Sequence, residues 1–232
     1  MAKAKAVLRI RPSVLTEIPP EVRRRLDQVQ TAHLSDNMAR TRGMHSAIRP
    51  WHGSGKLVGT ALTVRTRAGD NLLIHHAADM VKPGQVIVVD GGGDESRALI
   101  GEIVCRIARS NGAVGFVLDG AIRDSEAIRA MGFPVFARAV THVGPYKNGP
   151  GEINVPITCG GVPVHPGDLI VGDADGVVVI DPREMEAVVA AAYAQWQDEE
   201  ETLRRIASAG VDRSWVRTRL RNDPDYEYRF EE

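Results

Sequence analysis

Two glycine-marked segments carry the charged side chains with the clearest chemical potential. The first runs from Asp90 through three glycines to Asp94, and the second runs from Asp119 to Arg123 and Asp124. Each follows an apolar run typical of a buried strand. An adjacent Arg and Asp can hold one anionic ligand together, because a guanidinium binds a carboxylate bidentately while a carboxylate binds a divalent cation. This chemistry predicts one shared cleft for four side chains: Asp94, Asp119, Arg123 and Asp124. The alternative interpretation is a surface ion pair at a helix start.

Gly101 lies in a segment, 96–109, whose apolar residues have helical spacing: Leu99, Ile103, Val104 and Ile107. Glycine inside a helix costs about 1 kcal/mol relative to alanine, so its presence needs a reason. One interpretation is close packing of the helix against a neighbour. The other is that the helix begins near Gly101 and that the backbone amides of residues 102–104 point at an anion. The spacing alone leaves both interpretations open.

The elements around these segments follow the pattern of an α/β fold. Alternating or apolar runs predict strands over 57–67, 85–90, 113–120 and 134–140. Helical patterns over 71–80, 96–109 and 125–132 separate them, and Asp70 is the expected N-cap of the first. Parallel strands in such a sheet carry binding sites at their carboxyl ends. Short strands are also predicted within 144–180. Helices are predicted near 22–29 and over 182–209. The residues beyond the second helix form either a solvated tail or an arm packed on a partner subunit.

Composition excludes several classes of protein. The chain has 232 residues, is 43% hydrophobic and carries a formal net charge of −1. At this length a core needs no disulfide or structural metal, and near-neutral charge argues against direct nucleic-acid binding. The two cysteines, Cys105 and Cys159, have no metal-ligand spacing. No signal peptide or membrane span is recognisable, so we expect a cytoplasmic protein that makes no membrane contact.

Other candidate sites are weaker. The GGGD turn lacks the GxGxxG spacing of a dinucleotide site. His75 and His76 are neighbours within one predicted helix and point in different directions, so at most one of them can reach a site. Cys159 is expected to be a buried small residue. The acidic run 198–201 is typical of a solvated helix face, although one member could serve a neighbouring subunit.

A long ordered string of motifs resembles the RraA-like family. It consists of VIVVDGGGDESRALIGEIVCRIARSNGAVGFVLDGAIRD, then PVFA, then INVPITCGGVPVHPGDLIVGDADGVVVI. That family includes the 4-hydroxy-4-methyl-2-oxoglutarate/4-carboxy-4-hydroxy-2-oxoadipate aldolases and regulators of ribonuclease E activity, and the resemblance covers about residues 34–210. It implies a single-domain α/β fold, a swivelling β/β/α sandwich, with an N-terminal arm and helix (1–33), a core (34–181) and a C-terminal helix and tail (182–232). It also implies homotrimers or hexamers with sites between subunits.

The resemblance also assigns site residues. Asp124 would be the ligand of Mg²⁺ or Mn²⁺, and Arg123 would contact the pyruvoyl group of a 2-keto acid. Backbone amides of Gly101, Glu102, Ile103 and Val104 would bind the substrate carboxylate, which favours the helix start at Gly101. Glu102 would lie near a catalytic water, and Glu199 or Glu200 would enter from the adjacent subunit. One departure concerns the acidic residue commonly found three places after the Asp: here that place holds Ala127, and Glu126 comes one place earlier.

The resemblance therefore implies a metal-dependent lyase that cleaves a 4-hydroxy-2-oxo acid by retro-aldol reaction, decarboxylates oxaloacetate, or does both, giving pyruvate. The alternatives are a protein-binding regulator of a ribonuclease and a lyase or dehydratase acting on a different, sugar-derived keto acid. We expect the tail of the substrate to contact loop 141–151 and a neighbouring chain. The longer N- and C-terminal segments favour the enzymatic branch of the family.

Overall fold

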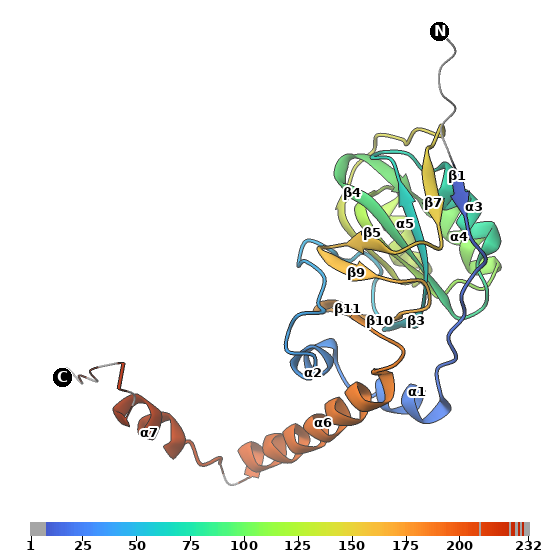
Figure 1. The fold of residues 1–232 in the computed structure, drawn as a ribbon. Helices are drawn as coiled ribbons and strands as arrows, with labels where there is room; N and C mark the ends of the chain where they lie inside the picture. The colour runs from blue at the N-terminus through green and yellow to red at the C-terminus, as the bar shows by residue number, and fades with distance from the viewer. Residues whose placement is uncertain (1–7, 209, 223, 226, 228, 230–232) are drawn as a thin grey trace. The chain divides into compact units, whose positions relative to one another are not determined.

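The computed structural model describes residues 8–208, 210–222, 224–225, 227 and 229 (Figure 1). The chain forms two units, Met1–Tyr193 and Ala194–Glu232. The predicted arm and tail therefore lie partly outside the described residues, at 1–7 and at 209, 223, 226, 228 and 230–232.

Four parallel strands form the centre of the first unit: β3 (Leu57–Thr66), β4 (Gln85–Ile100), β5 (Gly115–Ile122) and β6 (Val135–Val140). The sequence-based prediction of a parallel α/β arrangement is confirmed. Antiparallel neighbours of β3, namely β7 (Gly151–Ile153) and β10 (Leu169–Asp173), make the sheet mixed. Three further strands complete its nine: β1 (Leu8–Ile10), β2 (Arg49–Pro50) and β11 (Gly176–Ile180). A separate hairpin consists of β8 (Ile157–Cys159) and β9 (Val162–Val164).

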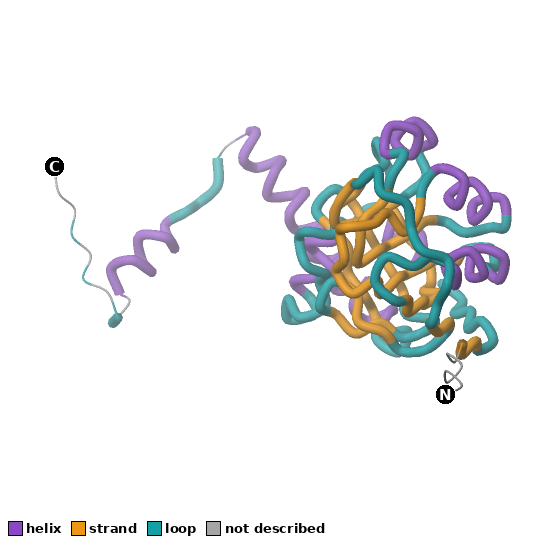
Figure 2. Tube along the Cα trace, turned by 90° about the horizontal axis from the view of Figure 1, so that it is seen from above, coloured by secondary structure: helices purple, strands orange, loops and turns teal. Residues whose placement is uncertain are grey.

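The sheet buries apolar side chains on both faces. One core contains side chains of three helices, α3 (Leu72–Met80), α4 (Glu102–Ser110) and α5 (Ser125–Met131), with Phe116 and Leu118 of β5. The other core contains Val117 of β5 and side chains of the β8–β9 hairpin, β10 and β11. Successive β5 residues therefore enter opposite cores, as the two-residue period of a strand requires. Figure 2 shows helices grouped beside the strands of this unit.

The strand β4 differs from the prediction, because it continues through the glycine turn to Ile100, so no helix begins at Ser96. Its pairing with β5 resumes beyond the turn with three register shifts. Leu99 explains why this stretch stays extended. A Cβ on Gly91 or on Gly120 would lie 2.7 Å from Leu99 Cδ1, so two glycines leave the space that Leu99 fills. Burying that leucine against the sheet outweighs the local helical spacing.

The remaining helices are α1 (Pro20–Leu26) and α2 (Thr31–Asp36) in the first unit, α6 (Met185–Ser208), which runs from the first unit into the second, and α7 (Ser214–Asn222). The long helix matches its predicted position. None of the described α7 side chains is buried. Within the described part of the chain, no helix is long and apolar enough to cross a membrane.

Candidate active site

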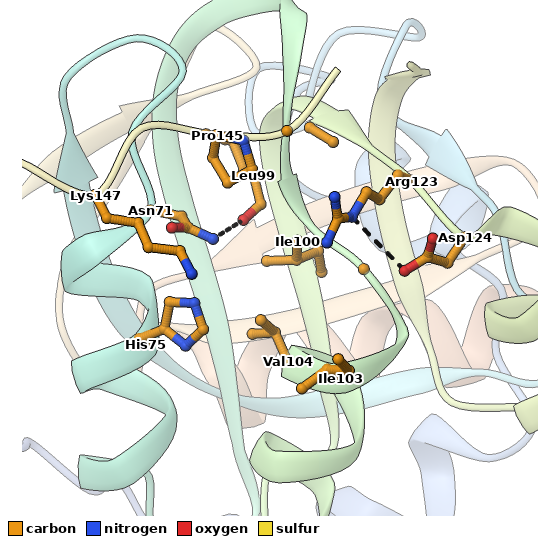
Figure 3. A pocket seen from close by; sticks show the side chains of 13 residues that line it. Asn71, His75, Leu99, Ile100, Ile103, Val104, Arg123, Asp124, Pro145 and Lys147 are labelled. Atoms are coloured by element: carbon orange, nitrogen blue, oxygen red, sulfur yellow. Dashed lines mark hydrogen bonds and ion pairs between the residues drawn. The ribbon is translucent and has the colours of Figure 1, made fainter. Parts of the chain in front are cut away.

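A pocket of about 310 Å³ opens where β4 and β5 end and α4 begins (Figure 3). This is the carboxyl edge of the parallel strands, where α/β sheets bind ligands. Its lining combines the predicted Arg–Asp pair with residues from α3 and from loop 141–151: Asn71, His75, Ala98, Leu99, Ile100, Gly101, Ile103, Val104, Arg123, Asp124, Gly144, Pro145 and Lys147.

Gly101 is the N-cap of α4, which confirms the interpretation that the helix starts there. Its φ of −149° is ordinary extended backbone, so conformation does not require glycine. Space does, because a Cβ on Gly101 would lie 2.3 Å from Asp124 Oδ2 and 3.0 Å from Arg123 Cγ. Glycine therefore allows the Arg–Asp pair to approach the first turn of α4 closely.

The carboxylate of Asp124 lies directly at that first turn. Its Oδ2 accepts a hydrogen bond from the backbone N–H of Glu102 at 3.1 Å, and the Arg123 Nε lies 3.8 Å from the same oxygen. Asp124 has a φ of 57°, a left-handed conformation that Asp tolerates better than most residues. The side chains of Arg123 and Asp124 remain 44% and 41% exposed. The ion pair foreseen as the alternative exists, but within the pocket, where both groups can reach a ligand.

Of the residues expected to bind the substrate carboxylate, Gly101, Ile103 and Val104 line the pocket. Glu102 contributes its N–H to Asp124, and its carboxylate pairs with Arg106 of the same helix at 2.7 Å. Burial raises the pKa of the Cys105 thiol to about 12, with help from the charges of Asp124 and Glu102. The thiol therefore remains protonated.

Asp94 and Asp119 do not join Arg123 and Asp124, so the predicted four-residue cleft is wrong. Asp119 lies on the opposite face of β5, where its carboxylate pairs with Arg138 and accepts the Gly160 N–H at 2.8 Å. The two-residue period of the strand places it there. Asp94 accepts hydrogen bonds from the N–H and hydroxyl of Ser96 within its own turn.

The pocket wall formed by α3 and loop 141–151 contains Asn71, His75 and Lys147 (Figure 3). His75 lines the pocket and His76 is exposed outside it, in agreement with the expectation that at most one of them can reach a site. Burial and the charge of Lys147 lower the pKa of His75, against an opposing effect of Asp79. Asn71 and Lys147 were not among the predicted site residues, although the loop that carries Lys147 was expected to contact the substrate.

The family model described as "RraA-like: Aldolase/RraA" matches residues 31–179. The chain belongs to the RraA-like family. A relative from Halalkalibacterium halodurans named "Putative 4-hydroxy-4-methyl-2-oxoglutarate aldolase" is 45% identical over 179 residues, which cover 77% of this chain and 85% of the relative.

Two solved structures extend the RraA-like comparison. An uncharacterized protein from Pseudomonas syringae pv. tomato is 28% identical with a TM-score of 0.75, covering 84% of this chain and 96% of that one. Streptomyces coelicolor RraAS2, described as an unusual member of the RNase ES inhibitor RraA protein family, is 27% identical with a TM-score of 0.73. That match covers 82% of this chain and 100% of RraAS2. The mixed α/β fold is thus that of RraA-like structures.

The donor set of this RraA-like pocket suits a water-rich cation site. No cluster of three or more His, Cys, Asp or Glu side chains that could hold a metal occurs among the described residues. Asp124 is the carboxylate in the pocket lining, and its Oδ2 already accepts one hydrogen bond. Mg²⁺ commonly binds one or two carboxylates and keeps several waters or substrate oxygens, so a single aspartate fits Mg²⁺ or Mn²⁺.

The two glutamates expected to act from an adjacent subunit lie on the part of α6 that belongs to the second unit. The carboxylate of Glu199 accepts a hydrogen bond from Gln195 Nε2 at 3.0 Å. Glu200 follows it within the acidic run of the helix.

Proposed function

We propose that this protein is a divalent-metal-dependent lyase that releases pyruvate from a 4-hydroxy-2-oxo acid and also decarboxylates oxaloacetate. The observation that carries the proposal is the meeting of Arg123, Asp124 and the first turn of α4 in one pocket. The relative named as an aldolase at 45% identity supports the same reaction class.

The first turn of α4 supplies anion-binding groups. Helix geometry leaves first-turn N–H groups without an intrahelical acceptor, and the helix dipole favours negative charge there. Asp124 takes the N–H of Glu102, which leaves the pocket-lining residues Ile103 and Val104 to offer theirs to the C1 carboxylate of the substrate. Gly101 keeps this region open.

Arg123 and Asp124 have different proposed roles. Asp124 would hold Mg²⁺ or Mn²⁺ together with waters, and the bound cation would act as a Lewis acid toward the substrate. Arg123 places a permanent positive charge beside the 2-oxo oxygen, where negative charge develops as the C–C bond breaks. Its charge is partly balanced by Asp124 at 3.8 Å, which limits the cost of holding it at the site in the absence of substrate.

Retro-aldol cleavage also needs a base for the 4-hydroxyl proton. Glu102, which lies between the pocket-lining residues Gly101 and Ile103 and pairs with Arg106, is one proposed base acting through water. Glu199 or Glu200 of a neighbouring subunit is the other, which requires a trimer or hexamer with sites between subunits. Decarboxylation of oxaloacetate needs no such base, so it depends on the cation and Arg123 alone.

Pyruvate release tests the proposal. Purified protein is assayed with oxaloacetate and with 4-hydroxy-4-methyl-2-oxoglutarate, in the presence of Mg²⁺ and after chelation. We expect pyruvate from both compounds with Mg²⁺ and none above the uncatalysed rate after chelation. If neither compound releases pyruvate while circular dichroism shows the protein to be folded, the proposed lyase activity is contradicted.

A second candidate, a regulator that binds a ribonuclease, is favoured by the similarity to RraAS2 over 82% of this chain. It predicts complex formation that does not depend on the pocket. Binding of a ribonuclease by the wild-type protein and equally by the Asp124→Asn variant, with no pyruvate release, supports the regulator. Ribonuclease binding and pyruvate release, measured on the same preparation, therefore distinguish the regulator from the lyase.

A further inference from the structure

The pocket has two cationic ends. Arg123 lies at one end beside Asp124, and Lys147 lies at the other beside His75, with the apolar side chains of Ile100 and Val104 between them (Figure 3). Such a pattern fits an elongated anion with charge at both ends and carbon between. The proposed function uses the Arg123 end and assigns nothing to the other.

We propose that Lys147 binds a second carboxylate, on the leaving half of the substrate, and thereby selects 4-hydroxy-2-oxo diacids over the corresponding monoacids. This inference rests on the proposed function, and it assigns specificity to the opposite wall of the same pocket. Arg123 would face the pyruvoyl half and Lys147 the half that departs after cleavage.

Lys147 has no counterion among the described residues. Within the part of the chain that the structure describes, its ammonium takes part in no ion pair or hydrogen bond. Arg123, by contrast, has Asp124 nearby. Burial and the positive charge of Lys147 lower the pKa of His75, against an opposing effect of Asp79. Lys147 therefore supplies the positive charge at this end of the pocket, and an entering carboxylate would balance it.

The backbone that presents Lys147 is fixed by Asp70. This carboxylate is fully buried, and its Oδ2 accepts the N–H groups of Asn148 at 2.7 Å and Gly149 at 3.0 Å. Its Oδ1 accepts the N–H of Leu72 at 3.0 Å, at the start of α3. One side chain therefore joins the loop that carries Lys147 to the helix that carries His75. A fixed backbone reduces the entropy lost on binding, while the exposed lysine side chain can still adjust.

Asn71 completes this wall. Its side chain is 3% exposed, and Nδ2 donates to the Leu99 carbonyl at 2.9 Å, which orients the amide. The buried Oδ1 atom has no hydrogen-bond partner among the residues that the structure describes. Figure 3 shows the Asn71 amide beside the Lys147 side chain. Because an ammonium has three donors, Lys147 can donate to this oxygen and to a ligand carboxylate at the same time. A buried acceptor without a partner is costly, so this arrangement favours a bound ligand that brings the ammonium onto Asn71.

Kinetics with paired substrates test the inference. Wild type, Lys147→Met and Lys82→Met are compared on 4-hydroxy-4-methyl-2-oxoglutarate and on 4-hydroxy-2-oxopentanoate, which lacks the second carboxylate. Methionine keeps the apolar stem and removes the charge, and Lys82 is an exposed lysine outside the pocket lining. We expect Lys147→Met to lower kcat/KM for the diacid about 10- to 100-fold, the range for a lost hydrogen bond to a charged group. Its monoacid value should stay within about twofold of wild type, and Lys82→Met should match wild type on both.

Binding of uncleavable analogues separates failure of this inference from failure of the lyase. Neither 2-oxoglutarate nor 2-oxopentanoate carries a 4-hydroxyl, so neither can undergo the cleavage. Calorimetry with Mg²⁺ should show tighter binding of 2-oxoglutarate to wild type, and loss of that preference in Lys147→Met. A preference that survives in the variant overturns the role of Lys147 even if cleavage is observed. A preference lost in the variant supports it even if the cleavage assay is negative.

Discussion

The backbone N–H of Glu102 donates to Oδ2 of Asp124 at 3.1 Å, and this bond joins the start of α4 to the start of α5. The carboxylate proposed to hold the cation is thereby aimed at the same helix end that is proposed to bind the substrate carboxylate. Its position depends on the absence of a side chain at residue 101. Several predictions about activity depend on this contact.

Replacing Gly101 with alanine should displace the Asp124 carboxylate. The new Cβ would lie 2.3 Å from Oδ2, and the backbone φ of −149° is one that alanine adopts without strain. Because displacement by about 1 Å can cost about 10²-fold in rate, we expect at least that loss of kcat/KM for pyruvate release. Gly43→Ala is the matched control, since its Cβ would meet no atom within 4 Å. Equal activity of the two variants would show that the close approach is unimportant.

Asp119→Ala should destabilise the fold without changing the chemistry. The substitution leaves Arg138 without its partner and removes the acceptor of the Gly160 N–H. Breaking such a largely buried pair costs about 3 kcal/mol. Denaturant unfolding should show that loss, while kcat/KM of the folded variant stays near wild type. A large drop in kcat/KM at unchanged stability would place Asp119 in the active site after all.

Asp119 and Asp124 show which features of the site could be predicted from the sequence and which could not. Both aspartates follow apolar runs and glycines, and the order of strands and helices was predictable from hydrophobic periodicity. Which of the two carboxylates reaches the pocket was not, because Asp119 still follows the alternation of β5 whereas Asp124 lies beyond the strand end, in a left-handed turn. The extension of β4 to Ile100 was not predictable either, because Leu99 packs in the space left by Gly91 and by Gly120 of the neighbouring strand.

The Lys147 end of the pocket was predictable only in outline. Loop 141–151 was expected to contact the substrate's tail, and it does line the pocket. Which of its residues faces inward depends on Asp70, which accepts two N–H groups from the loop across 78 and 79 residues of sequence. No local pattern indicates that pairing.

His75 should titrate below its ordinary value. Burial and Lys147 lower its pKa and Asp79 raises it, so the ring is neutral at pH 7. A pKa lower in the folded than in the unfolded state means that this group stabilises the protein above about pH 6.5, and that the stabilisation is lost as pH falls through the folded-state pKa. NMR titration of the ring protons should show an upward shift of the pKa in Lys147→Met and a downward shift in Asp79→Asn. Unchanged midpoints in both variants would contradict these charge effects.

Cys105 should be unreactive in the folded protein. With a pKa of about 12, about one thiol in 10⁴ is ionised at pH 8, and only the thiolate reacts. Cys159 is fully buried and its pKa is also raised well above the ordinary value. We expect a disulfide reagent at pH 8 to label neither thiol until denaturant is added, and then to label both. Rapid labelling of the native protein would show that α4 opens or packs differently.

Whether Asp124 holds the catalytic cation is tested by comparing Mg²⁺-dependent pyruvate release in Asp124→Asn and in Asp94→Asn. Asparagine tolerates the left-handed conformation at position 124 and removes only the charge. Asp94 follows the glycines of β4 and lies outside the pocket lining, so its variant controls for the loss of a carboxylate as such. We expect a loss of about 10²- to 10³-fold in kcat for Asp124→Asn and near wild-type release for Asp94→Asn. Full Mg²⁺-dependent activity of folded Asp124→Asn would contradict the proposed role of Asp124.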